Sequence, residues 1–175
     1  MHEGPPADPE QVARTILLRR LDAAPRTRGQ LATTLRECNV PEDVASRVLD
    51  RFEEVGLIDD RTFARMWVES RQRTRGLSGR ALQMELRSKG VADDLIADAL
   101  SSVSHEDEFA AARAVAERKL RSVAGLPRST QIRRLSGVLA RKGYGGGLAA
   151  QVVREVLDES AADAGDGNLG SAGWG

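Results

Sequence analysis

Basic side chains are concentrated in the middle of the chain, in a pattern that suits the binding of anionic groups. Between Arg61 and Gly90, eight basic residues stand against two acidic ones, so this stretch carries a charge of +6 although the whole chain is neutral. Arginine forms paired hydrogen bonds with phosphate and carboxylate groups. A charged helix is usually only solvated, but acids for internal salt bridges are scarce here, so the pattern favours binding. The predicted contacts are Arg71, Arg73, Arg75, Arg80, Arg87 and Lys89.

A second basic block lies further along the chain. Residues 113–142 carry +8, and the flanking blocks 91–112 and 143–175 carry −6 and −4. Basic residues are favoured at helix C-termini, which explains part of this pattern but not basic residues along whole helices. Charge sorted into blocks points to surfaces and partners. The predicted contacts of this second set are Arg121, Arg128, Arg133, Arg134, Arg141 and Lys142.

Residues for catalysis or metal binding are few. The chain has two histidines and one cysteine, Cys38, far apart in the sequence. Metal sites need such ligands clustered at defined spacing, and a nucleophile needs a nearby base. The glycine-rich stretch at residues 142–147 lacks the spacing of a phosphate-binding loop. The acidic pairs Asp59-Asp60 and Asp93-Asp94 stand where helices should begin, which indicates helix capping. We therefore expect no catalytic residue, no metal and no cofactor, and a protein that is not an enzyme.

The composition favours helices and a reducing environment. Aromatic residues make up only 3% of the chain, and strands enrich aromatic and β-branched residues. A single cysteine cannot form an internal disulfide, and Cys38 is expected to be a small buried side chain. The sequence has neither a long apolar run nor a signal peptide. We expect a cytoplasmic monomer that does not associate with membranes.

Apolar residues recur at a period of about 50 residues. With Val40, Val91 and Tyr144 taken as equivalent points, seven positions keep apolar character at matched offsets in three copies. Each copy is long enough for three helices, and units of this size are stabilised by stacking. The predicted fold is all-α, with three tandem three-helix repeats in an elongated, curved array. The predicted divisions are a disordered N-terminal tail at 1–10, repeats at 11–59, 60–104 and 105–160, and a disordered C-terminal tail at 161–175.

The junction between the second and third helix is similar in every copy. It reads Cys38-Asn39-Val40 in the first copy, Lys89-Gly90-Val91 in the second and Lys142-Gly143-Tyr144 in the third. Asn or Gly in the middle position suits a left-handed helix C-cap, and the apolar residue that follows is expected to pack back on its own unit.

Several of these segments resemble the core motif of the RecX family, which regulates the RecA recombinase. They are Gly56-Leu57-Ile58-Asp59-Asp60, Phe63-Ala64, Trp67-Val68-Glu69-Ser70-Arg71 and Glu85-Leu86-Arg87-Ser88-Lys89-Gly90-Val91. The resemblance covers residues 11–160, and the family consists of three tandem three-helix repeats. It implies a non-enzymatic protein that lies in the groove of the RecA–DNA filament and suppresses ATP hydrolysis, strand exchange and co-protease activity. The implied partners are the RecA filament and, weakly through phosphates, single- and double-stranded DNA.

A second interpretation is a DNA-binding transcriptional regulator. Residues 27–60 resemble the core of a winged-helix domain. Against it, residues 11–60 carry a net charge of −1, and no hairpin sequence supplies a wing.

Overall fold

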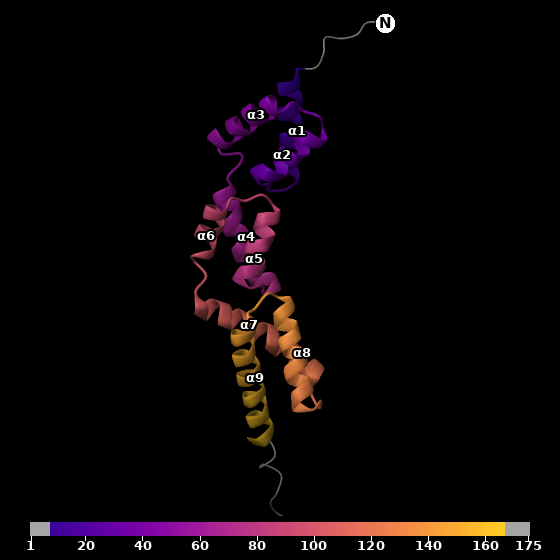
Figure 1. Cartoon of the computed structure of the whole chain (residues 1–175), viewed down its shortest axis with the longest axis vertical. Coiled ribbons are helices and arrows are strands. Elements are labelled where there is room, and N and C mark those ends of the chain that lie inside the picture. The colour runs from indigo at the N-terminus through magenta and orange to yellow at the C-terminus, as the bar shows by residue number, and fades with distance from the viewer. Residues whose placement is uncertain (1–7, 167–175) are drawn as a thin grey trace, which may run out of the picture. The chain divides into compact units, whose positions relative to one another are not determined.

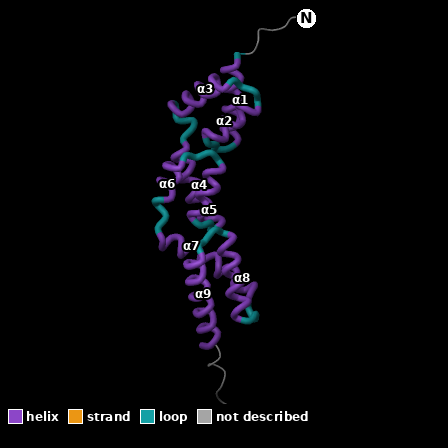
Figure 2. Tube along the Cα trace, in the orientation of Figure 1, coloured by secondary structure: helices purple, strands orange, loops and turns teal. Residues whose placement is uncertain are grey.

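The computed structural model describes residues 8–166, which form helices joined by short loops, without a strand (Figures 1 and 2). This confirms the predicted all-α class and the three helix triplets α1–α3, α4–α6 and α7–α9; their elongated, curved arrangement stays a prediction. The helices are α1 (Pro9–Ala23), α2 (Arg28–Glu37), α3 (Glu42–Glu54), α4 (Asp60–Arg75), α5 (Gly79–Ser88), α6 (Asp93–Leu100), α7 (His105–Lys119), α8 (Arg128–Arg141) and α9 (Gly146–Asp166), with a 3-10 turn (Leu120–Val123) after α7.

The ends of the helical region differ from the prediction. Helix α1 begins at Pro9, and α9 continues to Asp166. Residues 9–10 and 161–166, which were predicted to belong to the disordered tails at 1–10 and 161–175, are therefore helical. Alanines at 161, 162 and 164 are strong helix formers, and neither glycine nor proline interrupts α9 from residue 148 to residue 164. The rest of both predicted tails, residues 1–7 and 167–175, lies outside the described residues.

The chain divides into two compact units. The first is Met1–Glu69 with Gln83–Ser102, and the second is Ser70–Leu82 with Val103–Gly175. Helices α4 and α5 therefore each contribute residues to both units. The middle triplet is therefore divided between the two units, whereas the first and third triplets each lie within one unit.

The first triplet has its own apolar core. Helices α1, α2 and α3 pack on one another around Leu17, Leu31, Leu35, Val48 and Phe52, which are all buried. Leu31 and Leu35 are one helical turn apart on α2, and Val48 and Phe52 are one turn apart on α3, so each pair lies on one face of its helix.

The third triplet is built in the same way around smaller residues. Helices α7, α8 and α9 pack on one another around Ala112, Ala116, Leu135, Leu139 and Val152. The alanines on α7 let the neighbouring helices approach closely, and the two leucines of α8 fill the space between them.

The predicted caps are confirmed in all three copies. Asn39, Gly90 and Gly143 have φ values of 57°, 78° and 91°, in the left-handed region that asparagine and glycine adopt most easily. The same hydrogen bond closes each turn: Val40 N–H donates to the Leu35 carbonyl at 3.0 Å, Val91 N–H to Leu86 at 3.1 Å, and Tyr144 N–H to Leu139 at 3.2 Å. This is the Schellman arrangement, and it returns the following apolar side chain to the core.

These caps take part in a joint between successive repeats, which occurs once in each unit. In the first unit, the buried Thr27 hydroxyl at the N-cap of α2 donates a hydrogen bond to the Lys89 carbonyl at the end of α5. The Arg28 N–H, the first amide of α2, donates to the Asp60 carboxylate at 2.9 Å. Gly29 and Gly90 touch backbone to backbone, leaving no room for a Cβ on Gly29.

The second unit repeats this joint with different residues. Ser78 lies 51 residues after Thr27, and its N–H donates to the Lys142 carbonyl at 3.0 Å. The Gly79 N–H donates to Glu108 at 2.6 Å, as Arg28 does to Asp60. Thr27 and Ser78 are the two buried polar side chains recorded among the described residues. The Thr27 hydroxyl bonds across the first joint to the Lys89 carbonyl. The Ser78 hydroxyl instead accepts from the Ala81 N–H at 3.1 Å and caps its own helix, while the Ser78 backbone N–H makes the bond across the second joint.

Gly143 provides a test of the second joint. A Cβ at this position would lie 2.5 Å from the Ser78 hydroxyl oxygen and 2.9 Å from the Ala81 Cβ, at a φ of 91°. We expect Gly143→Ala to lower the free energy of unfolding by about 2–4 kcal/mol, from backbone strain and overpacking together. Gly146→Ala at the start of α9 is the matched control, because its methyl group meets no atom within 4 Å. Equal urea denaturation midpoints for the two variants would contradict the close packing of Gly143 against Ser78 and Ala81 at the second joint.

Tyr144, the only tyrosine of the chain, gives the same joint a pH dependence. Its hydroxyl donates to the Gly76 carbonyl at 2.8 Å, and burial, assisted by the negative charge of Glu108, raises its pKa to about 12. Because an unfolded tyrosine ionises near pH 10, the contribution of Tyr144 to stability is complete below about pH 10 and is lost as the pH rises to about 12. We expect the phenolate absorbance near 295 nm to appear with a midpoint about two pH units above that of the denatured chain; a midpoint near pH 10 would refute this. Tyr144→Phe should remove the loss of stability.

Candidate functional site

The structure divides the first set of predicted basic contacts between the two units. Arg87 and Lys89 belong to the first unit, while Arg71, Arg73, Arg75 and Arg80 belong to the second, which also holds the whole second set. The basic stretch that is continuous in sequence is therefore not one continuous feature of either unit.

Several guanidinium groups in the first unit are held by the chain's own carboxylates. Arg61 and Arg65 both bind Asp98 at 2.9 Å, and Arg87 binds Asp93 at 2.7 Å. Desolvation opposes the ionisation of Asp98, but the hydrogen bond and charge of Arg65, with the charge of Arg61, outweigh it and hold the pKa of Asp98 below its usual value. The expectation that acids are scarce is wrong here, because the partner acids come from the next block of the sequence and fold back.

The members of the acidic pairs Asp59-Asp60 and Asp93-Asp94 make different contacts. The Asp59 carboxylate accepts a hydrogen bond from the Thr62 N–H at 3.0 Å, which confirms it as a cap of α4. Asp60 instead caps α2 across the first joint. Asp93 binds Arg87, and α6 has no side-chain cap.

Lys89 lies over an aromatic ring. Its ammonium nitrogen is 4.3 Å from the centroid of the Trp67 ring, which stacks on Phe63 at 5.7 Å and donates from its indole N–H to Glu85 at 2.8 Å. A cation on a tryptophan face is attracted by the electron density of the ring. The ammonium group of Lys89 is therefore held in a defined place next to the first joint.

The second unit contains a basic groove of about 640 Å³ beside α8. Its floor includes the buried side chains of Val123 and Leu135, and no acidic residue lines it. None of its cations forms an ion pair within residues 8–166. These cations are Lys119, Arg133, Arg134, Arg141 and Lys142, and we call this set the α8 groove.

The α8 groove brings together four of the six residues predicted in the second set. Arg128 is paired with Asp158, and Arg121 is exposed outside the groove. Lys119 was missed by the sequence analysis. It lies at the end of α7, 14 residues before Arg133, and only the packing of α7 against α8 brings it to the groove. Cys38, expected to be buried, is exposed.

Arg113 of α7, a cation of the same unit, has a structural role instead. It binds Glu117 at 2.8 Å and also Glu159, at the far end of α9. Hydrogen bonding to Glu159 raises the pKa of Arg113 and lowers that of Glu159. Arg113 therefore ties α9 to α7.

Residues 8–166 hold no group of three or more His, Cys, Asp or Glu side chains placed to bind a metal ion. Within the same range, every helix is too short or too polar to cross a membrane.

The fold defines an all-helical protein built from three tandem three-helix repeats. Family models for the first, second and third three-helix domains of RecX match residues 13–52, 59–100 and 106–153, in that order. The chain therefore belongs to the RecX family.

Known relatives agree with this assignment. A protein of Streptomyces coelicolor named Regulatory protein RecX is 54% identical over 159 residues, covering 91% of this chain and 85% of the relative. Proteins of the same name are 48% identical in Thermobifida fusca (89% and 88% covered) and 43% identical in Mycolicibacterium smegmatis (87% and 83%). The crystal structure of RecX from Lactobacillus salivarius is 21% identical, covers 86% of this chain and 97% of its own, and superposes with a TM-score of 0.77, which shows the shared fold.

The distinction between structural and available cations can be tested by stability alone. We expect Arg113→Gln to lower the melting temperature, because Glu117, Glu155 and Glu159 lose their shared partner. Arg134→Gln in the α8 groove should leave the melting temperature unchanged or raise it slightly, because it relieves repulsion between like charges. Scanning calorimetry at low salt measures both. A larger loss in Arg134→Gln than in Arg113→Gln would show that the groove arginine has a structural role.

Proposed function

We propose that this chain regulates RecA by binding in the groove of the RecA–DNA filament and slowing ATP hydrolysis, strand exchange and co-protease activity. It would thereby modulate recombination and DNA repair. Membership of the RecX family and relatives named regulatory proteins support a regulatory role. The observation that carries the proposal is the α8 groove, where five cations converge without an internal partner among the described residues. Cations arranged in this way suit an extended anionic partner.

The mechanism rests on occupancy rather than chemistry. The α8 groove, with the exposed Arg75 and Arg80 of the same unit, would contact phosphates or acidic loops of the filament, and Arg71 and Arg73 belong to the same proposed set. A chain that occupies the filament groove hinders the movements that hydrolysis and strand exchange require. Several weak contacts along a repeating partner add up through avidity.

Contacts with DNA alone are proposed to be weak and directed at phosphates, for both single and double strands. Lysine and arginine contacts with phosphates carry no sequence information, and their strength falls steeply with salt. A transcriptional regulator of the winged-helix type is less well supported, because residues 8–166 contain no strand and so lack the hairpin that forms a wing.

RecA ATPase activity on single-stranded DNA tests the proposal. We expect the chain to slow hydrolysis at stoichiometric ratios, and Arg133→Glu/Arg134→Glu/Arg141→Glu to lose most of this effect. Arg14→Glu/Arg47→Glu/Arg51→Glu is the matched control, because it makes the same charge change at exposed positions of the first triplet. Binding to DNA and to preformed filaments should be measured separately, also for Arg71→Glu/Arg73→Glu/Arg75→Glu. If the unmodified chain does not slow hydrolysis, the proposed function is wrong.

A further inference from the structure

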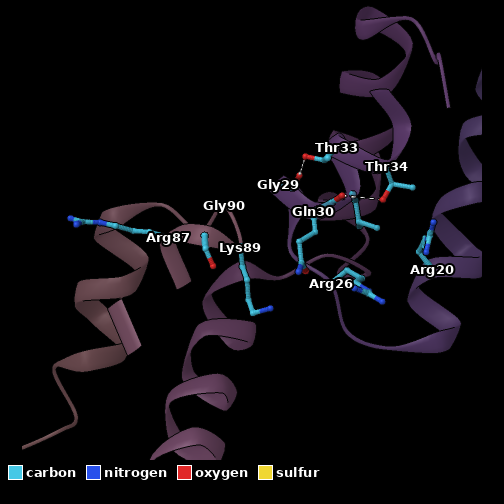
Figure 3. Close-up of a pocket in the computed structure, with 11 residues that line it drawn as sticks. Arg20, Arg26, Gly29, Gln30, Thr33, Thr34, Arg87, Lys89 and Gly90 are labelled. Carbon is cyan, nitrogen blue, oxygen red and sulfur yellow. Dashed lines mark hydrogen bonds between the residues drawn. The ribbon is translucent and has the colours of Figure 1, made fainter. Parts of the chain in front are cut away.

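The first joint contains a pocket that the proposed function does not use. Its volume is about 350 Å³, and it lies within the first unit, between the end of α1, the N-terminal half of α2 and the cap that follows α5 (Figure 3). Four basic side chains line it, together with amide, hydroxyl and backbone groups. The ones that matter here are Arg20, Arg26, Gln30 and Lys89.

No carboxylate lines this pocket, although the chain has as many acidic as basic residues. Within residues 8–166, Arg20, Arg26 and Lys89 form no ion pair. Neighbouring arginines behave differently. Arg28 binds Asp50 at 2.7 Å and Glu53 at 2.8 Å, and Arg87 binds Asp93; Figure 3 shows Arg87 extending away from the other lining side chains. Of the four cations that line the pocket, Arg87 therefore has an acidic partner, whereas Arg20, Arg26 and Lys89 have none in the described part of the chain.

Arg26 supplies an observation that points to a ligand. Its Nε atom is buried and has no hydrogen-bond partner. Leaving a buried charged donor without a partner costs free energy, and such groups are rare in folded proteins. The polar groups beside it offer further donors. The Gln30 side-chain oxygen accepts from the Thr27 N–H at 3.1 Å, so its NH₂ group is the end left to donate.

We propose that this pocket binds a phosphate group, with Arg26 and Arg20 as the guanidinium donors and Lys89 and Gln30 completing the site. In Figure 3 the side chains of Arg26, Gln30 and Lys89 extend to the same side of the joint. Guanidinium groups can form paired hydrogen bonds with two phosphate oxygens. The ammonium group of Lys89 is held in a defined position by its contact with the Trp67 ring. The site itself is argued from contacts of the first unit, and the choice of a nucleic-acid strand as its ligand rests on the proposed binding of DNA phosphates. Its test can fail while the proposed regulation of RecA stands.

The repeat favours a nucleic-acid strand as the source of the phosphate. At the period of the joint, 51 residues, Arg20 corresponds to Arg71. Lys142 lies 53 residues after Lys89 and occupies the equivalent place, directly before the capping glycine of the next copy. Cations that recur with the repeat suit a ligand whose phosphates recur along a strand, whereas an acidic peptide has no such regularity.

The side-chain Nε–H resonance of Arg26 in ¹H–¹⁵N spectra tests the site directly. Titrating the full chain with oligo(dT), we expect this resonance to shift, and Arg26→Gln to weaken binding by about ten-fold, the loss of one charged hydrogen bond. Arg36→Gln on α2 is the matched control: it removes one exposed arginine of the same triplet that does not line the pocket. The same spectra report whether each variant is folded, and Arg20→Gln is the second variant.

Titrations with inorganic phosphate, oligo(dT) and poly-glutamate distinguish the possible ligands of the pocket. A shift of Arg26 with inorganic phosphate, and at lower concentration with oligo(dT), supports a site for strand phosphates; a response to inorganic phosphate alone supports a site for free phosphate. A shift with poly-glutamate but with neither phosphate ligand overturns the proposal, as does an Arg26 resonance that no ligand moves. Equal weakening in Arg26→Gln and Arg36→Gln would also overturn it, because the effect would then be one of overall charge. None of these measurements involves RecA.

Discussion

The structure depends on one kind of contact, which occurs twice. The N-terminus of α2 packs against the C-terminal cap of α5, and the N-terminus of α5 packs against the C-terminal cap of α8. A helix begins with unpaired N–H groups and ends with unpaired carbonyl groups, and both must find partners when they are buried. The joint satisfies the two ends with each other and with one carboxylate, Asp60 or Glu108. The buried hydroxyl groups of Thr27 and Ser78 each accept from an N–H of their own helix, and that of Thr27 also donates across the joint to the Lys89 carbonyl. The close contact also explains the caps, since Gly90 and Gly143 meet neighbouring atoms at distances that leave no room for a side chain.

This constraint also decides where positive charge is placed. The residue before each capping glycine is a lysine, Lys89 or Lys142, whose carbonyl is used by the joint. Neither side chain forms an ion pair within residues 8–166, and the ammonium group of Lys89 lies over the Trp67 ring. Lys89 belongs to the pocket of the first joint, and Lys142 to the α8 groove. A basic side chain next to the last carbonyls of a helix is also favoured by the helix dipole. The residue that completes the fold therefore carries the charge that is available for binding.

Much of this architecture can be predicted from the sequence, because the signals are local. The three caps follow from Asn or Gly before an apolar residue, and the helix triplets follow from apolar spacing. What escaped prediction depends on contacts between distant segments. Asp98 neutralises Arg61 and Arg65 from more than 30 positions away, Lys119 reaches the α8 groove through packing, and Arg26 in a loop between two helices gave no motif at all. The end of α9 was also missed: residues 161–166 were predicted as tail, although Ala161, Ala162 and Ala164 precede Gly165 and continue the helix.

The unpaired cations are informative because they work against folding. Five like charges around one groove repel one another, and the chain has acids enough to neutralise them, as it does at Arg113 and Arg28. An exposed ion pair adds little stability, so its absence alone would mean little. A whole groove and a whole pocket without an acid are different, since the acidic residues of this chain lie in neighbouring blocks and pair with other cations. Functional sites commonly retain such locally unfavourable arrangements. The two sites differ in exposure: Arg133, Arg134 and Arg141 of the α8 groove are exposed, whereas the Nε of Arg26 is buried and has no hydrogen-bond partner among the described residues.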